Sequence, residues 1–165
     1  MCLVVIVDTN VLVVANGRNT HADLECQIQC VRAIRDISLK GSAVVDDGWL
    51  ILDEYRKRLN FEGQPGAGDA FFKHIYDNMY SSKRVERVSI TVVDDEERTF
   101  KELPPNTLDR SDQKFLAVAV VARAPILNTT DSDWHNEREL VSRLDVVVQQ
   151  LCPQHATRRN QPLQT

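Results

Sequence analysis

Apolar, β-branched runs alternate with helical patterns along nearly the whole chain, and this alternation restricts the fold more than any other feature. Strand-like runs lie at 3–7, 43–45, 85–93, 126–127 and 144–148, separated by helical stretches near 22–38, 47–59, 71–80 and 109–123. Such alternation is typical of right-handed βαβ units, in which helices cover both faces of a parallel sheet. We therefore expect an α/β fold, a single-domain α/β/α sandwich around a central, mostly parallel sheet.

The 165-residue length suits one domain, which we place at residues 1–150, followed by a polar C-terminal tail at 151–165 that is loose from Pro153 onward. The first apolar run is short and is followed directly by Asp8, and no run approaches the ~18 apolar residues of a membrane span. The four cysteines show no disulfide-framework spacing, which predicts reduced thiols. We expect a cytoplasmic protein with no membrane contact.

Acidic residues follow two of the predicted strands. Asp8 ends the first strand, and Asp131 and Asp133 follow the strand at 126–127. The carboxyl ends of parallel strands share one edge of the sheet, so these side chains should meet there. An unpaired buried carboxylate is very costly, and each must therefore be solvated, hydrogen-bonded or bound to a cation.

Two predicted helices supply further acids. Glu54 lies on the flank of the apolar face of the helix at 47–59, whereas Asp53 points nearly opposite. Asp112 shares the apolar face of the helix that starts near Asp109. Each acid also has a structural interpretation: Asp109 or Asp47 as a helix cap, Asp112 as an acid favoured by the helix dipole, Asp8 as a helix start, and Asp131 with Asp133 as part of a turn.

Taken together, the acids favour a metal site over a set of caps. Carboxylates from separate segments on one sheet edge repel each other unless a cation is present. Ligand sets that contain only oxygen suit Mg²⁺ or Mn²⁺ better than Zn²⁺. The net charge of −4 argues against a nucleic-acid partner only if no cation binds these acids.

Four segments together resemble a PIN domain, in order from about residue 3 to residue 148. They are Asp8-Thr9-Asn10 after an apolar strand, Glu54 in a helix, the Asp-x-x-Asp-x-x-Phe-Leu-Ala-x-Ala stretch that contains Asp112, and Thr129-Thr130-Asp131-Ser132-Asp133-Trp134. The resemblance implies that Asp8, Glu54, Asp112 and Asp131 form an acidic catalytic quartet that binds Mg²⁺ or Mn²⁺, with Asp133 as an additional acid. It also implies supporting polar roles for Thr9, Asn10 and Thr129. Thr130 and Trp134 depart from the usual family pattern.

The function implied by this resemblance is that of a metal-dependent endoribonuclease that leaves 5′-phosphate and 3′-hydroxyl ends. Arg18 and Arg110 are neighbours of the acid groups in the sequence and are our predicted RNA contacts. Small members of the family are commonly toxins of toxin–antitoxin pairs, and the length fits that role and RNA processing equally. RNA is the expected substrate, and an antitoxin protein or a second copy of the chain are the alternatives for a protein partner. The alternatives are a non-catalytic PIN-like scaffold that binds RNA or protein and, with less support, a receiver-like regulatory domain.

Overall fold

The central sheet of the computed structural model, which describes residues 3–18, 21–94 and 99–156, has five parallel strands. Its order is β3-β2-β1-β6-β7, formed by Val85–Val88, Gly41–Asp46, Leu3–Val7, Ile126–Asn128 and Val148–Gln150. Every neighbouring pair is parallel. The predicted α/β/α architecture is therefore confirmed.

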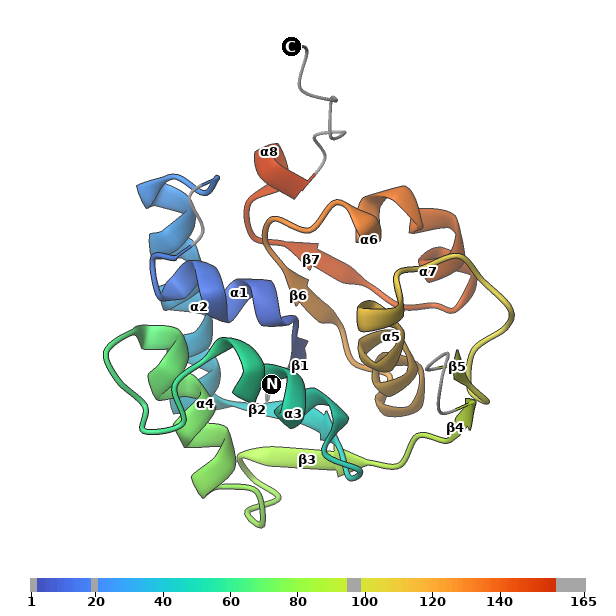
Figure 1. The fold of residues 1–165 in the computed structure, drawn as a ribbon, viewed down its shortest axis with the longest axis horizontal. Helices are drawn as coiled ribbons and strands as arrows, with labels where there is room; N and C mark the ends of the chain where they lie inside the picture. The colour runs from blue at the N-terminus through green and yellow to red at the C-terminus, as the bar shows by residue number, and fades with distance from the viewer. Residues whose placement is uncertain (1–2, 19–20, 95–98, 157–165) are drawn as a thin grey trace.

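Helices cover both faces of this sheet (Figure 1). The helices α1 (Thr9–Ala15), α2 (Leu24–Lys40) and α4 (Ala67–Asp77) pack together on one side. The other side carries α5 (Arg110–Ala122), α6 (Asp133–Asn136) and α7 (Arg138–Arg143), and α3 (Leu50–Arg58) packs against β2 and α5. The innermost strand β1 is covered on both faces, so Val5, Ile6 and Val7 are all at most 1% exposed.

Several predicted boundaries were wrong. The run at 85–93 is not one strand, because β3 ends at Val88 and β4 (Val92–Asp94) forms a separate antiparallel pair with β5 (Thr99–Phe100). The last strand begins at Val148 rather than at 144, where α7 is ending. The missed helix α1 follows Asp8 directly.

The carboxylate that satisfies the first turn of α3 belongs to Asp46 and not to Asp47, which the sequence offered as a cap; the N-cap position itself is Trp49. The two carboxylate oxygens of Asp46 accept hydrogen bonds from the backbone N–H groups of Leu50 and Ile51, both at 2.9 Å. Asp47 is exposed. The last residue of β2 therefore satisfies the first turn of the next helix.

The packed part of the chain continues beyond residue 150. Cys152 and Ala156 are buried, and Pro153–Ala156 forms the short helix α8. The expectation that the chain is loose from Pro153 onward is wrong for residues 153–156, and residues 157–165 of the predicted tail lie outside the described part. None of the described helices is long and apolar enough to cross a membrane.

A disulfide bond joins Cys26 in α2 to Cys152, across 126 positions of the sequence. The prediction of unpaired cysteines is therefore wrong. Sequence spacing could not reveal this pair, because the two residues meet only after α2 and the segment after β7 have packed together. Cys30 is the free thiol among the described cysteines, and it is buried.

Candidate metal centre

Three carboxylates from three elements meet at the carboxyl edge of the sheet. Asp8 follows β1, Asp131 follows β6, and Asp112 lies in the first turn of α5. One oxygen from each side chain lies within 4.8 Å of the other two. The strand-end argument thus places Asp8 and Asp131 correctly, and the helical-face argument places Asp112.

Asp8 is only 4% exposed and occupies the N-cap position of α1, but its side chain makes no capping bond. Its Oδ2 instead accepts a hydrogen bond of 2.7 Å from the indole N–H of Trp134. Burial raises the pKa of Asp8 to about 7, helped by the nearby charges of Asp131 and Glu54 and opposed by the Trp134 bond. The Trp134 indole therefore supports the Asp8 carboxylate directly.

Asp112 is as deeply buried as Asp8. It is 4% exposed, and its Oδ2 is buried with no hydrogen-bond partner among the described residues. Burial, followed by the charges of Asp8 and Asp131, raises its pKa to about 10. Asp109, one turn earlier, has the predicted capping role, since it accepts hydrogen bonds from the N–H and the hydroxyl of Ser111.

Asp131 and Asp133 combine the two interpretations that their sequence permits. Asp131 Oδ1 accepts a hydrogen bond of 2.9 Å from the backbone N–H of Asp133, as in a turn. Burial nevertheless raises the pKa of Asp131, and it also raises that of Asp133, where the Asp131 charge adds to it. The structure groups Asp131 with the other two carboxylates, whereas Asp133 lies outside the group of three.

Glu54 lies beside the three carboxylates and is held by its own partners. Its side chain is 20% exposed, and its two oxygens accept hydrogen bonds from the Lys114 ammonium (2.9 Å) and the Thr9 hydroxyl. The outward orientation predicted for Asp53 is confirmed, because that residue is exposed. Lys114 is a buried cation at the site that sequence analysis did not single out, although its place inside an apolar helical stretch next to Asp112 was a usable signal.

Asn10, one of the predicted supporting residues, fixes the loop after β6. The Asn10 side chain donates to the Asn128 side chain (2.9 Å) and accepts from the backbone N–H of Thr129 (3.0 Å). Asn128 also donates to the Asp131 carbonyl at 2.8 Å. The Thr129 hydroxyl does not support the acids as predicted, because it contacts the sulfur atoms of three cysteines.

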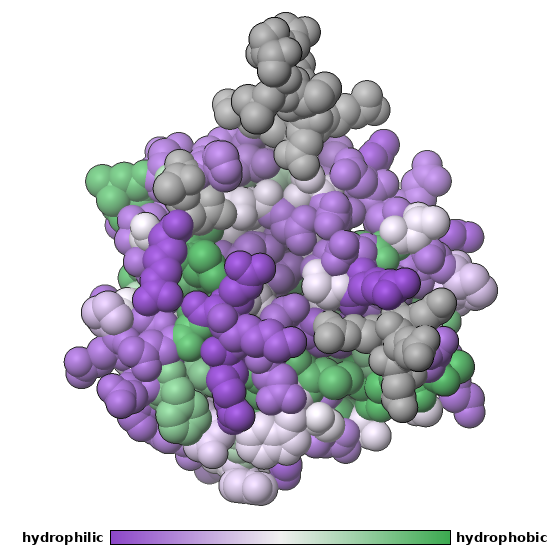
Figure 2. All heavy atoms as spheres, in the orientation of Figure 1, coloured by the Kyte–Doolittle hydropathy of each residue, from purple (hydrophilic) through white to green (hydrophobic). Residues whose placement is uncertain are grey.

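The two predicted RNA contacts differ in their surroundings. Arg110 lines a pocket of about 330 Å³ that also contains the site residues Glu54 and Lys114 and the basic residues Lys57 and Arg58. Arg18 is engaged elsewhere: its guanidinium donates to the Arg58 carbonyl at 3.4 Å and lies 3.9 Å from the buried Asp69 carboxylate. The face seen in Figure 2 is largely hydrophilic, with strongly hydrophilic side chains gathered near its centre.

The donor set of the three carboxylates fits a hard divalent cation. Without a cation, such crowded and buried acids must retain protons, as the raised pKa values of Asp8 and Asp112 indicate. A bound cation would be coordinated by the oxygen of Asp112 that otherwise has no partner among the described residues. Carboxylate oxygens without a sulfur or imidazole ligand suit Mg²⁺ or Mn²⁺.

Searches of known protein families, curated proteins and solved structures found no match to this chain.

Proposed function

We propose that the chain is a metal-dependent endoribonuclease of the PIN type, which hydrolyses RNA phosphodiester bonds at the acidic edge of its sheet. One observation carries the proposal: Asp8, Asp112 and Asp131 come from separate segments, yet they bring one oxygen each within 4.8 Å of the others. Burying three acids together is costly, and a purely structural sheet edge has no need of it. A site that binds a cation and a phosphate does need it.

Asp8, Asp112 and Asp131 would hold Mg²⁺ or Mn²⁺, with Glu54 and Asp133 at the border of the site. Such a cation, when bound, polarises the scissile phosphate and lowers the pKa of a water molecule. Asp131 or Asp112 orients that water and accepts its proton. Trp134 holds the Asp8 carboxylate through its 2.7 Å hydrogen bond to Oδ2.

Basic side chains beside the acids supply the attraction that an RNA backbone requires. The pocket next to Glu54 brings together Lys57, Arg58, Arg110 and Lys114. Lys114 also lines this pocket, and its buried ammonium is bound to the Glu54 carboxylate and to the Ser111 carbonyl. We assign the phosphate contact to Arg110 before Arg18, because the Arg18 guanidinium already faces Asp69.

The partners follow from this proposal. RNA is the substrate, and an antitoxin that covers the acidic cluster, or a second copy of the chain, is a protein partner to be sought. The proposal includes a cytoplasmic location. Because Cys26 and Cys152 form a disulfide bond, unpaired cysteines no longer support that location. Light scattering after size-exclusion chromatography, applied to the protein as purified from its source, would reveal either protein partner.

Cleavage of a fluorescently labelled, partly structured RNA tests the activity. Purified protein would be incubated with EDTA, Mg²⁺ or Mn²⁺, and product ends would be determined. We expect metal-dependent cleavage to 5′-phosphate and 3′-hydroxyl ends, which Asp8→Asn abolishes. Asp36→Asn is the control, because Asp36 is an exposed acid on α2, outside both the acidic cluster and the pocket that contains Arg110.

Equal loss of activity in both variants would contradict the site assignment. Absence of cleavage by the wild type, together with Mn²⁺ binding that Asp8→Asn removes, would favour the scaffold over the enzyme. Absence of both cleavage and Mn²⁺ binding would overturn the metal centre itself.

A further inference from the structure

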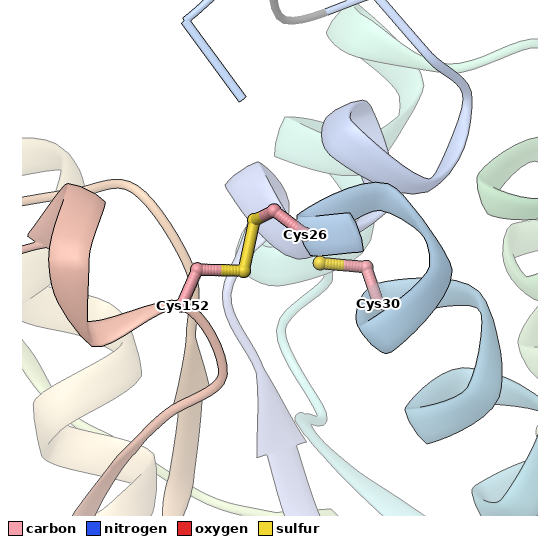
Figure 3. A group of neighbouring side chains, drawn as sticks. All are labelled: Cys26, Cys30 and Cys152. Carbon is pink, nitrogen blue, oxygen red and sulfur yellow. A yellow bond between two sulfur atoms is a disulfide. The ribbon is translucent and has the colours of Figure 1, made fainter. Parts of the chain in front are cut away.

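A second convergence of like side chains lies outside the acidic cluster. The sulfur atoms of Cys26, Cys30 and Cys152 all lie within 4.8 Å of one another. Two come from successive turns of α2, and the third comes from the segment between β7 and α8 (Figure 3). All three residues are at most 1% exposed. The nuclease proposal uses none of them.

The Thr129 hydroxyl marks the centre of this sulfur cluster. Its oxygen lies 3.1 Å from the sulfur of Cys26, 3.3 Å from that of Cys30 and 3.1 Å from that of Cys152. Three sulfurs around one polar atom define a compact, enclosed site. A hydroxyl can also serve as a hydrogen-bond donor to thiolate sulfur, which is what such a site requires when it is charged.

The disulfide bond accounts for only two of the three sulfurs. The Cys30 thiol points toward the Cys26–Cys152 bond without joining it (Figure 3). Burial raises the pKa of Cys30, so it remains a neutral thiol when no cation is near. A simple cross-link between α2 and the chain after β7 has no need of this third buried sulfur, whereas a metal site with three ligands does.

We propose that Cys26, Cys30 and Cys152 form a three-thiolate site for Cu(I) once the Cys26–Cys152 bond is reduced. Reduction by a thiol or phosphine supplies two electrons, and the two freed sulfurs take up two protons. Binding of Cu(I) then displaces the protons of the thiols that bind it into the buffer. This site does not depend on the nuclease activity.

The ligand set selects the cation. Thiolate sulfur selects soft cations, among which Cu(I) accepts three ligands in a trigonal arrangement. Structural Zn²⁺ is almost always held by four ligands, and the sulfur cluster contains only three Cys, His, Asp or Glu ligands from the described residues. His155, three positions after Cys152, lies instead with its Nε2 3.5 Å from Asp23 Oδ2.

Competition with a chromophoric Cu(I) chelator such as bicinchoninate tests the site. Wild-type protein would be reduced with a phosphine, transferred anaerobically to reductant-free buffer, checked by circular dichroism and titrated. We expect one Cu(I) per chain, and protection of three thiols from alkylation. The same protein left oxidised is a control without mutation, and we expect it to bind far less Cu(I), because its disulfide occupies two ligands.

Two variants sharpen the test. Cys30→Ser should lower Cu(I) affinity by at least about 100-fold, more than the usual effect of changing an outer-shell group. Cys2→Ser removes the fourth cysteine of the chain and should bind Cu(I) like the wild type. A parallel titration with Zn²⁺ should give much weaker binding.

Three results would overturn the proposal. The first is Cu(I) affinity in Cys30→Ser equal to that of the wild type. The second is reduced wild type that retains no Cu(I), folded or not. The third is binding of Zn²⁺ in preference to Cu(I), which would replace the three-coordinate site with a different one.

Discussion

The acidic cluster and the sulfur cluster are built alike and stabilised differently. Each gathers three like side chains, from three segments in the acidic cluster and from two in the sulfur cluster, and both border the short stretch from Asn128 to Asp131. In the sulfur cluster, a covalent bond joins two of the three members. In the acidic cluster no such bond is available, so the carboxylates must hold protons or a cation.

The covalent bond satisfies most of the sulfur cluster, whereas the acidic cluster still contains buried groups that no described residue compensates. The disulfide satisfies two sulfurs as long as it is intact and leaves one neutral thiol. The acidic cluster keeps an unpartnered oxygen on Asp112 and raised pKa values on all three members. Uncompensated groups are where ligands are expected to bind. The comparison therefore favours the acids, rather than the oxidised sulfurs, as the place where a divalent cation would bind.

The largest effect should come from removing one charge of the acidic cluster. Asp112→Asn should lower metal-dependent RNA cleavage by roughly 10³-fold, because a bound cation contributes several kcal/mol of transition-state stabilisation. The same variant should make the metal-free protein more stable, since it relieves repulsion from Asp8 and Asp131. Cleavage assays and urea unfolding in EDTA measure the two effects. Lower stability in EDTA would show that Asp112 is structural.

The next effect should come from opening the covalent bond of the sulfur cluster. Cys152→Ser should lower the free energy of unfolding by roughly 2–5 kcal/mol, the usual range for removal of a native disulfide. Cys30→Ser should cost less, because it removes a buried thiol but no covalent bond. Urea unfolding without reductant measures both. Equal losses would contradict the view that the bond, rather than sulfur packing, stabilises this region.

A smaller effect should appear in the pH dependence of the metal-free protein. Folding raises the pKa of Asp8 to about 7 and that of Asp112 to about 10, so the folded state holds protons that the unfolded state has released. Stability from this cluster is therefore full below about pH 4 and falls as pH rises through 7. We expect the free energy of unfolding in EDTA to fall steadily between pH 5 and pH 8.

Unfolding at several pH values in EDTA measures this slope, with Asp8→Asn as the control that should flatten it. Saturating Mn²⁺ should reverse it, because the cation binds the deprotonated acids. A slope that is the same with and without Mn²⁺ would contradict the assignment of these acids as the metal ligands.

Sequence reasoning predicted the acidic cluster better than the sulfur cluster for a physical reason. Asp8 and Asp131 follow strands whose order and direction bring their ends together, and the period of a helix places Asp112. Cys26 and Cys152 have no such rule, because their contact depends on how α2 packs against a segment after the last strand. The periodicity of a sequence shows which side of a helix or strand each side chain occupies. It does not show which distant segment packs against that helix or strand.

The same limit explains the partners that were missed around the acids. Trp134 is one turn beyond Asp131, and nothing in the sequence indicates that its N–H reaches Asp8, 126 positions earlier. Lys114 was visible as a basic neighbour of Asp112, but its pairing with Glu54 depends on how α3 packs against α5. The fold class followed from the pattern of the whole chain, whereas these contacts required three-dimensional coordinates.

The smallest effect should distinguish Asp109 from Asp112, the two acids at the N-terminal end of α5. Asp109 is exposed, and its carboxylate is satisfied by the N–H and the hydroxyl of Ser111. Asp109→Ala should therefore cost about 1 kcal/mol of stability, as the loss of an N-cap does. It should leave Mn²⁺ affinity within about twofold, because Asp109 lies outside the group of three carboxylates and solvent screens its exposed charge. Urea unfolding and an Mn²⁺ titration, run beside Asp112→Asn, measure both, and a large loss of Mn²⁺ binding in Asp109→Ala would extend the metal centre to the cap.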